Sequence, residues 1–139
     1  MELLKKLISG SANQPEHKHN ANPTLHWHPV KNEVDIQHII ERSEQKPCAI
    51  FKHSTRCSIS ELAKNRLERQ WTLPDESIEM YFLDLLAHRS VSNHIAEVFS
   101  VHHESPQLIL IHKGEAVYDD SHTDITIANL TEALADLKI

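Results

Sequence analysis

The residue best suited to chemistry is Cys57, in the hexapeptide TRCSIS of residues 55–60. A polar stretch precedes it and apolar residues at helical spacing follow it, so Cys57 is predicted to lie where a helix begins. Free amide donors and the positive end of the helix dipole favour a thiolate there, which lowers a cysteine pKa from about 8.5 towards neutrality. Arg56, with Lys52 and His53 upstream, is expected to add positive charge on the same side. The pattern predicts a reactive thiolate.

Ser60 stands three residues after Cys57, where a dithiol redox protein would carry its second cysteine. A Cys-x-x-Ser pair cannot close an internal disulfide, but its thiolate can attack a mixed disulfide and hold the adduct until an outside thiol resolves it. Ser60 could donate a hydrogen bond to the thiolate or simply satisfy backbone. Ser58 and Glu61 have capping-box spacing, which supports a helix start here. The alternative is that Cys57 is a small, buried, inert side chain.

Cys48 lies within an apolar run and is predicted to be structural. A strand from Cys48 to His53 would span roughly 15 Å at about 3.3 Å per residue. A disulfide requires Cα atoms within about 7 Å of each other. Cys48 is therefore not expected to resolve an adduct on Cys57.

The elements that must position Cys57 follow from hydrophobic periodicity and from capping and turn residues. We expect a short edge strand over 25–30, a helix from Asn32 to about Ser43, a central strand over 48–51, a helix over 59–71, a strand over 78–83, a helix capped by Ser90, a hairpin of 107–111 and 115–118 turning at Lys113-Gly114, and a helix capped by Thr126. This β-α-β-α-β-β-α order, preceded by one helix and a possible strand, predicts an α/β fold with a mixed sheet flanked by helices.

Length and composition limit the remaining possibilities. The chain of 139 residues fits one domain, predicted over 25–139, behind a polar, partly disordered tail over 1–24. A net charge of -6 offers no basic surface for nucleic acid. Two cysteines indicate a reduced, cytoplasmic protein. No run is long enough to span a membrane, although the amphipathic segment 3–8 could form a short helix or a weak membrane-surface anchor.

Four short blocks occur in order along the chain: FKHSTRCSIS at 51–60, SNHIA at 92–96, HESPQ at 103–107, and Ser121-His122 with Ile125-Thr126. In these blocks the sequence resembles the YtxJ-type monothiol bacilliredoxins, a thioredoxin-like family linked to the low-molecular-weight thiol bacillithiol. The resemblance runs through most of residues 47–137. It implies a thioredoxin fold and removal of bacillithiol from protein mixed disulfides, with Cys57 at the nucleophile's position.

The resemblance also implies which residues meet the substrate. Ser105 and Pro106 match the substrate-facing loop. In a thioredoxin-like topology their peptide bond is a candidate cis bond facing the cysteine turn, with an ordinary trans bond as the alternative. Lys52, Arg56 and His122 are candidates, by charge and position, for binding the carboxylates of the small thiol. Bacillithiol would be a co-substrate, protein mixed disulfides the clients, and no resident cofactor is expected.

The sequence leaves two other classes of function open. The chain's twelve histidines could bind a metal, although no spacing typical of a structural zinc site is present. The histidines considered are His17, His19, His26, His28, His53, His102 and His103. The domain could also be a thioredoxin-like interaction module without turnover. Alkylation of Cys57 across pH distinguishes a reactive thiolate from an inert thiol.

Overall fold

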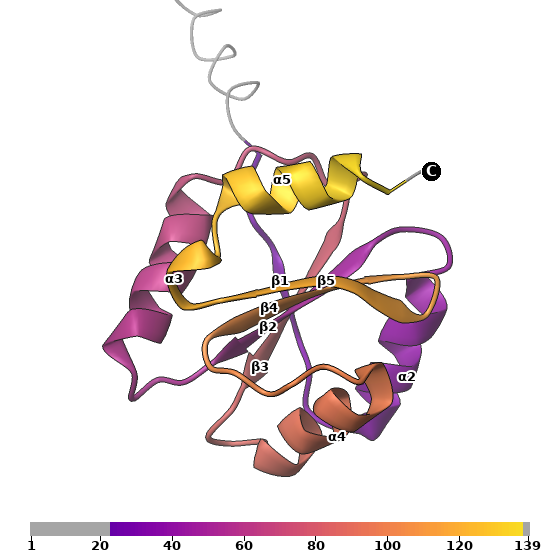
Figure 1. Ribbon diagram of the computed structural model, residues 1–139, viewed down its shortest axis with the longest axis vertical. Helices are drawn as coiled ribbons and strands as arrows, with labels where there is room; N and C mark the ends of the chain where they lie inside the picture. The colour runs from indigo at the N-terminus through magenta and orange to yellow at the C-terminus, as the bar shows by residue number, and fades with distance from the viewer. Residues whose placement is uncertain (1–22, 138–139) are drawn as a thin grey trace, which may run out of the picture.

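The computed structural model describes residues 23–137, in which five strands form one sheet in the order β1-β3-β2-β4-β5 (Figure 1). The elements in chain order are β1 Trp27–Pro29, α2 Glu33–Arg42, β2 Cys48–His53, α3 Ser58–Arg69, β3 Glu79–Asp84, α4 Arg89–Phe99, β4 Gln107–His112, β5 Glu115–Ser121, the 3₁₀ helix η1 His122–Asp124 and α5 Ile127–Ala135. The predicted order of strands and helices is confirmed, including the edge strand that contains Pro29.

The central strand is β2, all six residues of which are buried. It pairs parallel with β3 and antiparallel with β4, and β4 pairs antiparallel with β5, so the sheet is mixed as predicted. A strand buried on both faces needs apolar side chains at successive positions, which is the pattern of Cys48–Phe51. This strand carries the chain directly to the turn that holds Cys57.

Helices cover both faces of the sheet (Figure 1). On one face Ala49 and Phe51 of β2 pack in a core cluster with residues of α3 and α5. On the other face Cys48 and Ile50 pack with residues of α2 and α4. Successive strand residues point to opposite faces, so alternate residues of β2 contact α3 and α5 on one face and α2 and α4 on the other.

Local signals in the sequence explain three element boundaries. Asn32 Oδ1 accepts a hydrogen bond from Asp35 N at 2.9 Å, and this bond caps α2. Thr126 Oγ1 accepts one from Asn129 N at 3.0 Å at the start of α5. Positive φ angles of 52° at Lys113 and 80° at Gly114 form the tight turn between β4 and β5, as predicted.

Two helix starts differ from prediction. The cap of α4 is His88, so α4 begins at Arg89 and Ser90 lies inside its first turn. The cap of α3 is Cys57, and Ser58 is already its first residue. The expected capping box at Ser58 is therefore wrong by one position. Both errors have the same cause, since residue type favours a cap while the preceding strand and turn decide where the helix begins.

The predicted tail over residues 1–24 and the amphipathic segment over 3–8 lie outside the described residues, apart from residues 23 and 24. The division of the chain at residue 25 therefore stays a prediction. Within residues 23–137, no helix has the length and apolar character needed to cross a membrane.

Candidate active site

Cys57 lies in the turn between β2 and α3 as the cap residue of α3. Its backbone is extended, its N–H donates to Ser54 O at 3.1 Å, and its carbonyl accepts from Glu61 N at 3.1 Å. The thiol is free and the residue is only partly buried. Its side chain makes no capping hydrogen bond. The main chain thus holds Cys57 in place and leaves the sulfur available at the first turn of the helix.

The Ser105–Pro106 step lies at the same end of the sheet as the Cys57 turn, where β2 ends and β4 begins. Lys52 pairs with Gln107, which places Pro106 beside the end of β2, just before the chain turns to Cys57. The peptide bond between Ser105 and Pro106 is cis, as predicted. Ser105 Oγ is buried and has no hydrogen-bond partner within residues 23–137.

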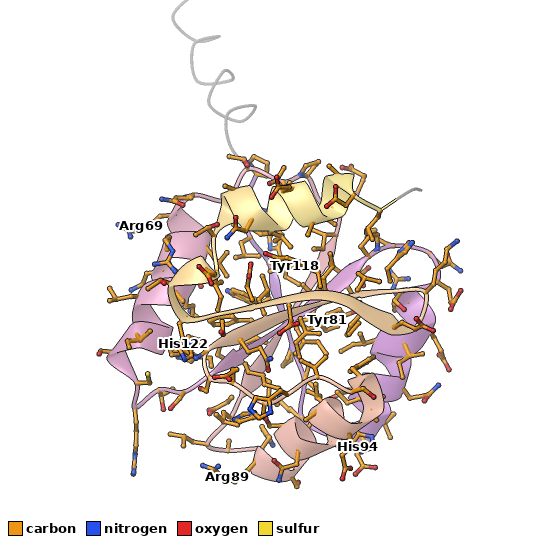
Figure 2. All side chains as sticks on the ribbon, viewed as in Figure 1. Arg69, Tyr81, Arg89, His94, Tyr118 and His122 are labelled. Atoms are coloured by element: carbon orange, nitrogen blue, oxygen red, sulfur yellow. The ribbon has the colours of Figure 1, made fainter. Side chains whose placement is uncertain are left out.

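His122, in η1, lies at the same end of the sheet and contacts the Ser105–Pro106 step through its backbone. Its N–H donates to Pro106 O at 3.2 Å, and its ring Nε2 lies 3.9 Å from Glu104 Oε1. Arg66 of α3 donates to the carbonyl of Ile125 at 2.8 Å and to that of His122 at 3.5 Å. His122 lies beside α3 in Figure 2. The structure therefore places the Ser105–Pro106 step beside the end of β2 that leads to the Cys57 turn, and it joins His122 to that step through Pro106 O.

Lys52 does not lie with Arg56, contrary to prediction. It is fully buried on the face of the sheet covered by α2 and α4, whereas Arg56 is exposed in the turn. Its Nζ donates to Ser92 O at 3.2 Å, and burial lowers the pKa of Lys52 to about 8. The strand runs on to His53, and strand alternation therefore turns Lys52 inward and away from α3.

His53 is also buried and does not supply the expected positive charge. Its ring packs against the rings of Phe51 and Phe82 at centroid distances of 5.9 and 5.4 Å. Burial lowers the pKa of His53, which keeps the imidazole neutral near pH 7. His53 Nε2 lies 3.6 Å from Glu61 Oε2. This carboxylate favours the tautomer with its proton on Nε2, which leaves Nδ1 as an acceptor.

Ser60 uses its hydroxyl within the protein. Its Oγ lies 2.6 Å from His53 Nδ1 and accepts from Ser54 N at 3.0 Å. Because His53 Nδ1 is an acceptor, the hydroxyl proton of Ser60 points to the imidazole. Ser60 therefore braces the first turn of α3 against β2, and of the two roles considered above the structural one fits.

Ser60→Ala should lower the free energy of unfolding by about 1–3 kcal/mol, since it leaves a buried N–H and a buried imidazole nitrogen without partners. Iodoacetamide alkylation of Cys57 should change by less than about tenfold, because the hydroxyl is already engaged by His53 and Ser54. Urea unfolding and mass-resolved labelling measure the two effects. Ser58→Ala, at an exposed position in the same turn, is the control and should be neutral within about 0.5 kcal/mol. A large loss of alkylation with unchanged stability would contradict this role for Ser60.

Cys48 lies at the opposite end of β2 from the Cys57 turn and is fully buried. Its Sγ donates to Lys46 O at 3.4 Å. Burial, and then the nearby carboxylate of Glu79, raise the pKa of Cys48 to about 12. Cys48 stays a protonated thiol at neutral pH, in keeping with the structural role predicted for it.

Three polar residues near the site, Ser92, His103 and Gln107, lie in the blocks that carry the family resemblance, but the sequence predicted no role for them at this site. His103 Nδ1 lies 3.2 Å from Lys52 Nζ. Gln107 is fully buried, and its Nε2 donates to His102 O at 2.9 Å. The signal that could have found them is the presence of Lys52 and Gln107 in otherwise apolar strands, because a buried polar side chain requires partners.

The histidines do not assemble a metal site in the part of the chain that the structure describes. Within residues 23–137 no group of three or more His, Cys, Asp or Glu side chains is arranged to hold a metal ion. His17 and His19 lie outside the described residues. The metal-binding hypothesis therefore gains no support from residues 23–137.

Solved structures with a thioredoxin fold resemble this chain closely in architecture. A protein provisionally described as an oxidoreductase with a thioredoxin fold is 29% identical, with a TM-score of 0.67 over 77% of this chain and 92% of that chain. The thioredoxin of Malassezia sympodialis is 11% identical, with a TM-score of 0.64 over 83% of this chain and 92% of that chain. The thioredoxin of Trypanosoma brucei brucei is also 11% identical, with a TM-score of 0.64 over 84% and 94%. The fold is therefore thioredoxin-like.

A family model extends this likeness from fold to thiol chemistry. The model described as monothiol bacilliredoxin BrxC matches residues 28–130, which include Cys57, the Ser105–Pro106 step and His122. Family and fold together support a thiol–disulfide oxidoreductase role. The chain belongs to the monothiol bacilliredoxin BrxC family.

Proposed function

We propose that this chain removes bacillithiol, or a similar small thiol, from mixed disulfides on proteins, with Cys57 as the nucleophile. The observation that carries the proposal is the contrast between the two cysteines. Cys57 is partly exposed at the start of α3, whereas Cys48 is fully buried at the far end of β2. A chain with one accessible thiol suits exchange with an outside thiol.

The proposed cycle has two exchange steps. The Cys57 thiolate attacks the bacillithiol sulfur of the mixed disulfide, a sulfur–sulfur bond forms on Cys57, and the client cysteine leaves as a thiolate. A second bacillithiol thiolate then attacks the adduct, which releases bacillithiol disulfide and restores the Cys57 thiolate. Each step exchanges one disulfide bond for another, so the two steps together need no external oxidant or reductant. No other residue of the chain needs to resolve the adduct.

We propose that residues around the Cys57 turn, at the end of β2, recognise the small thiol. Arg56 is exposed next to the nucleophile, and His122 donates its backbone N–H to Pro106 O at 3.2 Å. Both could bind carboxylates of the thiol, while Ser105 backbone pairs with the extended disulfide. Lys52 is removed from this group because it is fully buried. Bacillithiol acts as co-substrate, no resident cofactor is invoked, and the reducing cytoplasm is the proposed compartment.

Intact mass spectrometry tests the proposal. The protein is incubated with bacillithiol disulfide and, separately, with glutathione disulfide, and then with a bacillithiolated client protein. We expect one bacillithiol adduct per chain, located on Cys57 by peptide mapping, and loss of the same mass from the client. Faster adduct formation with glutathione disulfide than with bacillithiol disulfide would show that glutathione, and not bacillithiol, is the small thiol. Absence of any adduct on Cys57 would favour the interaction module without turnover.

A further inference from the structure

Lys52 is a buried amine without a carboxylate partner in the part of the chain that the structure describes. Its side chain is fully buried, and its Nζ donates to Ser92 O of α4 and to His103 Nδ1, both at 3.2 Å. Burying an ammonium group carries a large desolvation free energy unless hydrogen bonds within the protein offset it. A methionine would fill similar space without that cost. The contribution specific to Lys52 is therefore its pair of hydrogen bonds.

The contact with His103 reaches the segment that leads to the substrate-facing step. His103 lies two residues before Ser105, between α4 and β4. Lysine can only donate, so His103 Nδ1 accepts and the ring proton lies on Nε2. Ser92 Oγ lies 3.4 Å from the same ring nitrogen. Lys52 and Ser92 thus both contact Nδ1 of His103, a residue that is otherwise exposed.

Gln107 provides a second anchor for the same segment. Lys52 and Gln107 are direct partners across β2 and β4, so their side chains share one face of the sheet. Gln107 Nε2 donates to His102 O at 2.9 Å, and Gln107 Oε1 accepts from Glu104 N at 3.3 Å. Two adjacent buried polar side chains thus hold three consecutive residues, 102–104. The chain then enters the Ser105–Pro106 step directly from these anchors.

We propose that Lys52 is a positioning residue that, together with Gln107, fixes residues 102–104 and thereby sets where the Ser105–Pro106 step meets a mixed disulfide bound at Cys57. This inference rests on the proposed function. It replaces a direct role of Lys52 in binding the small thiol with an indirect one through His103. Lys52 acts from the α2/α4 face, so it should affect docking of the disulfide more than the reactivity of the sulfur.

The kinetic test uses Lys52→Met and His103→Leu, which remove either side of the contact, and His103→Asn, whose amide oxygen preserves an acceptor near the Nδ1 position. Lys52→Met and His103→Leu should raise KM for the bacillithiolated client about tenfold, with kcat within about twofold. Alkylation of Cys57 by iodoacetamide should be unchanged. His103→Asn should stay near wild type. His102→Leu is the neighbouring control, because the His102 side chain is 91% exposed and does not contact Lys52.

A titration of His103 by NMR tests the contact without substrate. Burial and then Lys52 lower the pKa of His103, while Glu104 raises it and Arg89 and His102 lower it further. Arg89 marks the start of α4 in Figure 2. Lys52→Met should raise the pKa of His103 and speed amide exchange over residues 102–105. His102→Leu should leave amide exchange there unchanged.

The two tests separate this inference from the proposed function. If the wild-type protein transfers no thiol, the proposed function fails, while the NMR result still reports on the contact. If Lys52→Met leaves both KM and the His103 titration unchanged, the positioning role is wrong. It is also wrong if kcat and alkylation of Cys57 fall in step with the rise in KM, because Lys52 would then act on the nucleophile.

Discussion

Cys57→Ala is expected to abolish transfer of the small thiol, with a rate at least about 1,000-fold below wild type. The reason is that the sulfur of Cys57 is the only proposed attacking atom, and nothing else in the described structure can replace it. Ser60 is fully buried against His53, and Cys48 is fully buried at the far end of β2. The measurement is loss of the bacillithiol mass from a modified client over time.

Cys48→Ala is the matched control for this experiment. It removes the other sulfur of the chain, yet transfer should stay within about twofold while the free energy of unfolding falls by about 1 kcal/mol. In the wild-type protein, Cys48 should alkylate only after denaturation, because burial raises its pKa to about 12. Equal transfer by the Cys57→Ala and wild-type proteins would refute the redox proposal.

Glu79→Gln should produce a large change in stability, about 2 kcal/mol at pH 7. The Glu79 carboxylate accepts hydrogen bonds from the guanidinium of Arg42 and from the Tyr81 hydroxyl, the latter at 2.7 Å, and Lys46 Nζ lies 3.8 Å away. The hydrogen bond from Arg42 is the main cause that lowers the pKa of Glu79 from 4.5 to about 2, against the opposing effect of burial.

The sign of the pH dependence follows from this lowered pKa. The folded state favours the carboxylate, so the stabilisation is fully present above pH 4.5 and is lost as the pH falls towards 2. Stability curves of wild type and Glu79→Gln should therefore converge over that interval. Glu33→Gln is the control, since the Glu33 side chain is 69% exposed. Parallel curves down to pH 2 would contradict the assigned pKa. Transfer at pH 7 should be unaffected by either variant, because Glu79 begins β3 at the end away from Cys57.

Periodicity and caps predicted the fold well because they report local physics. The apolar run at 48–51 requires burial on both faces, the Lys113-Gly114 pair suits a tight turn, and the Asn32 cap needs only its own backbone geometry. The position of Cys57 at a helix start was predicted from local signals in the same way. The position of the Ser105–Pro106 step could not be predicted from local signals alone, because it lies beside the end of β2 only through the order of strands in the sheet.

Side-chain direction at the end of β2 could not be predicted in the same way. The apolar run stops at Phe51, so the extension of the strand to His53 carries no local sign that the side chains of Lys52 and His53 are buried. That extension buries both side chains on opposite faces and gives them partners far along the chain, such as His103. A single sequence contains no local signal for such long-range pairing.

The separation of Cys48, which begins β2, from Cys57, which lies in the turn beyond the other end of β2, has a further consequence for redox balance. A protein with a closable dithiol has its own two-electron reduction potential and can store oxidation internally. This chain has only two cysteines, and the strand between them keeps them apart, so it has no such couple within one molecule. Under the proposed mechanism, the fraction of Cys57 carrying an adduct follows the ratio of oxidised to reduced small thiol around it. The occupancy of one side chain would then report the state of the whole thiol pool.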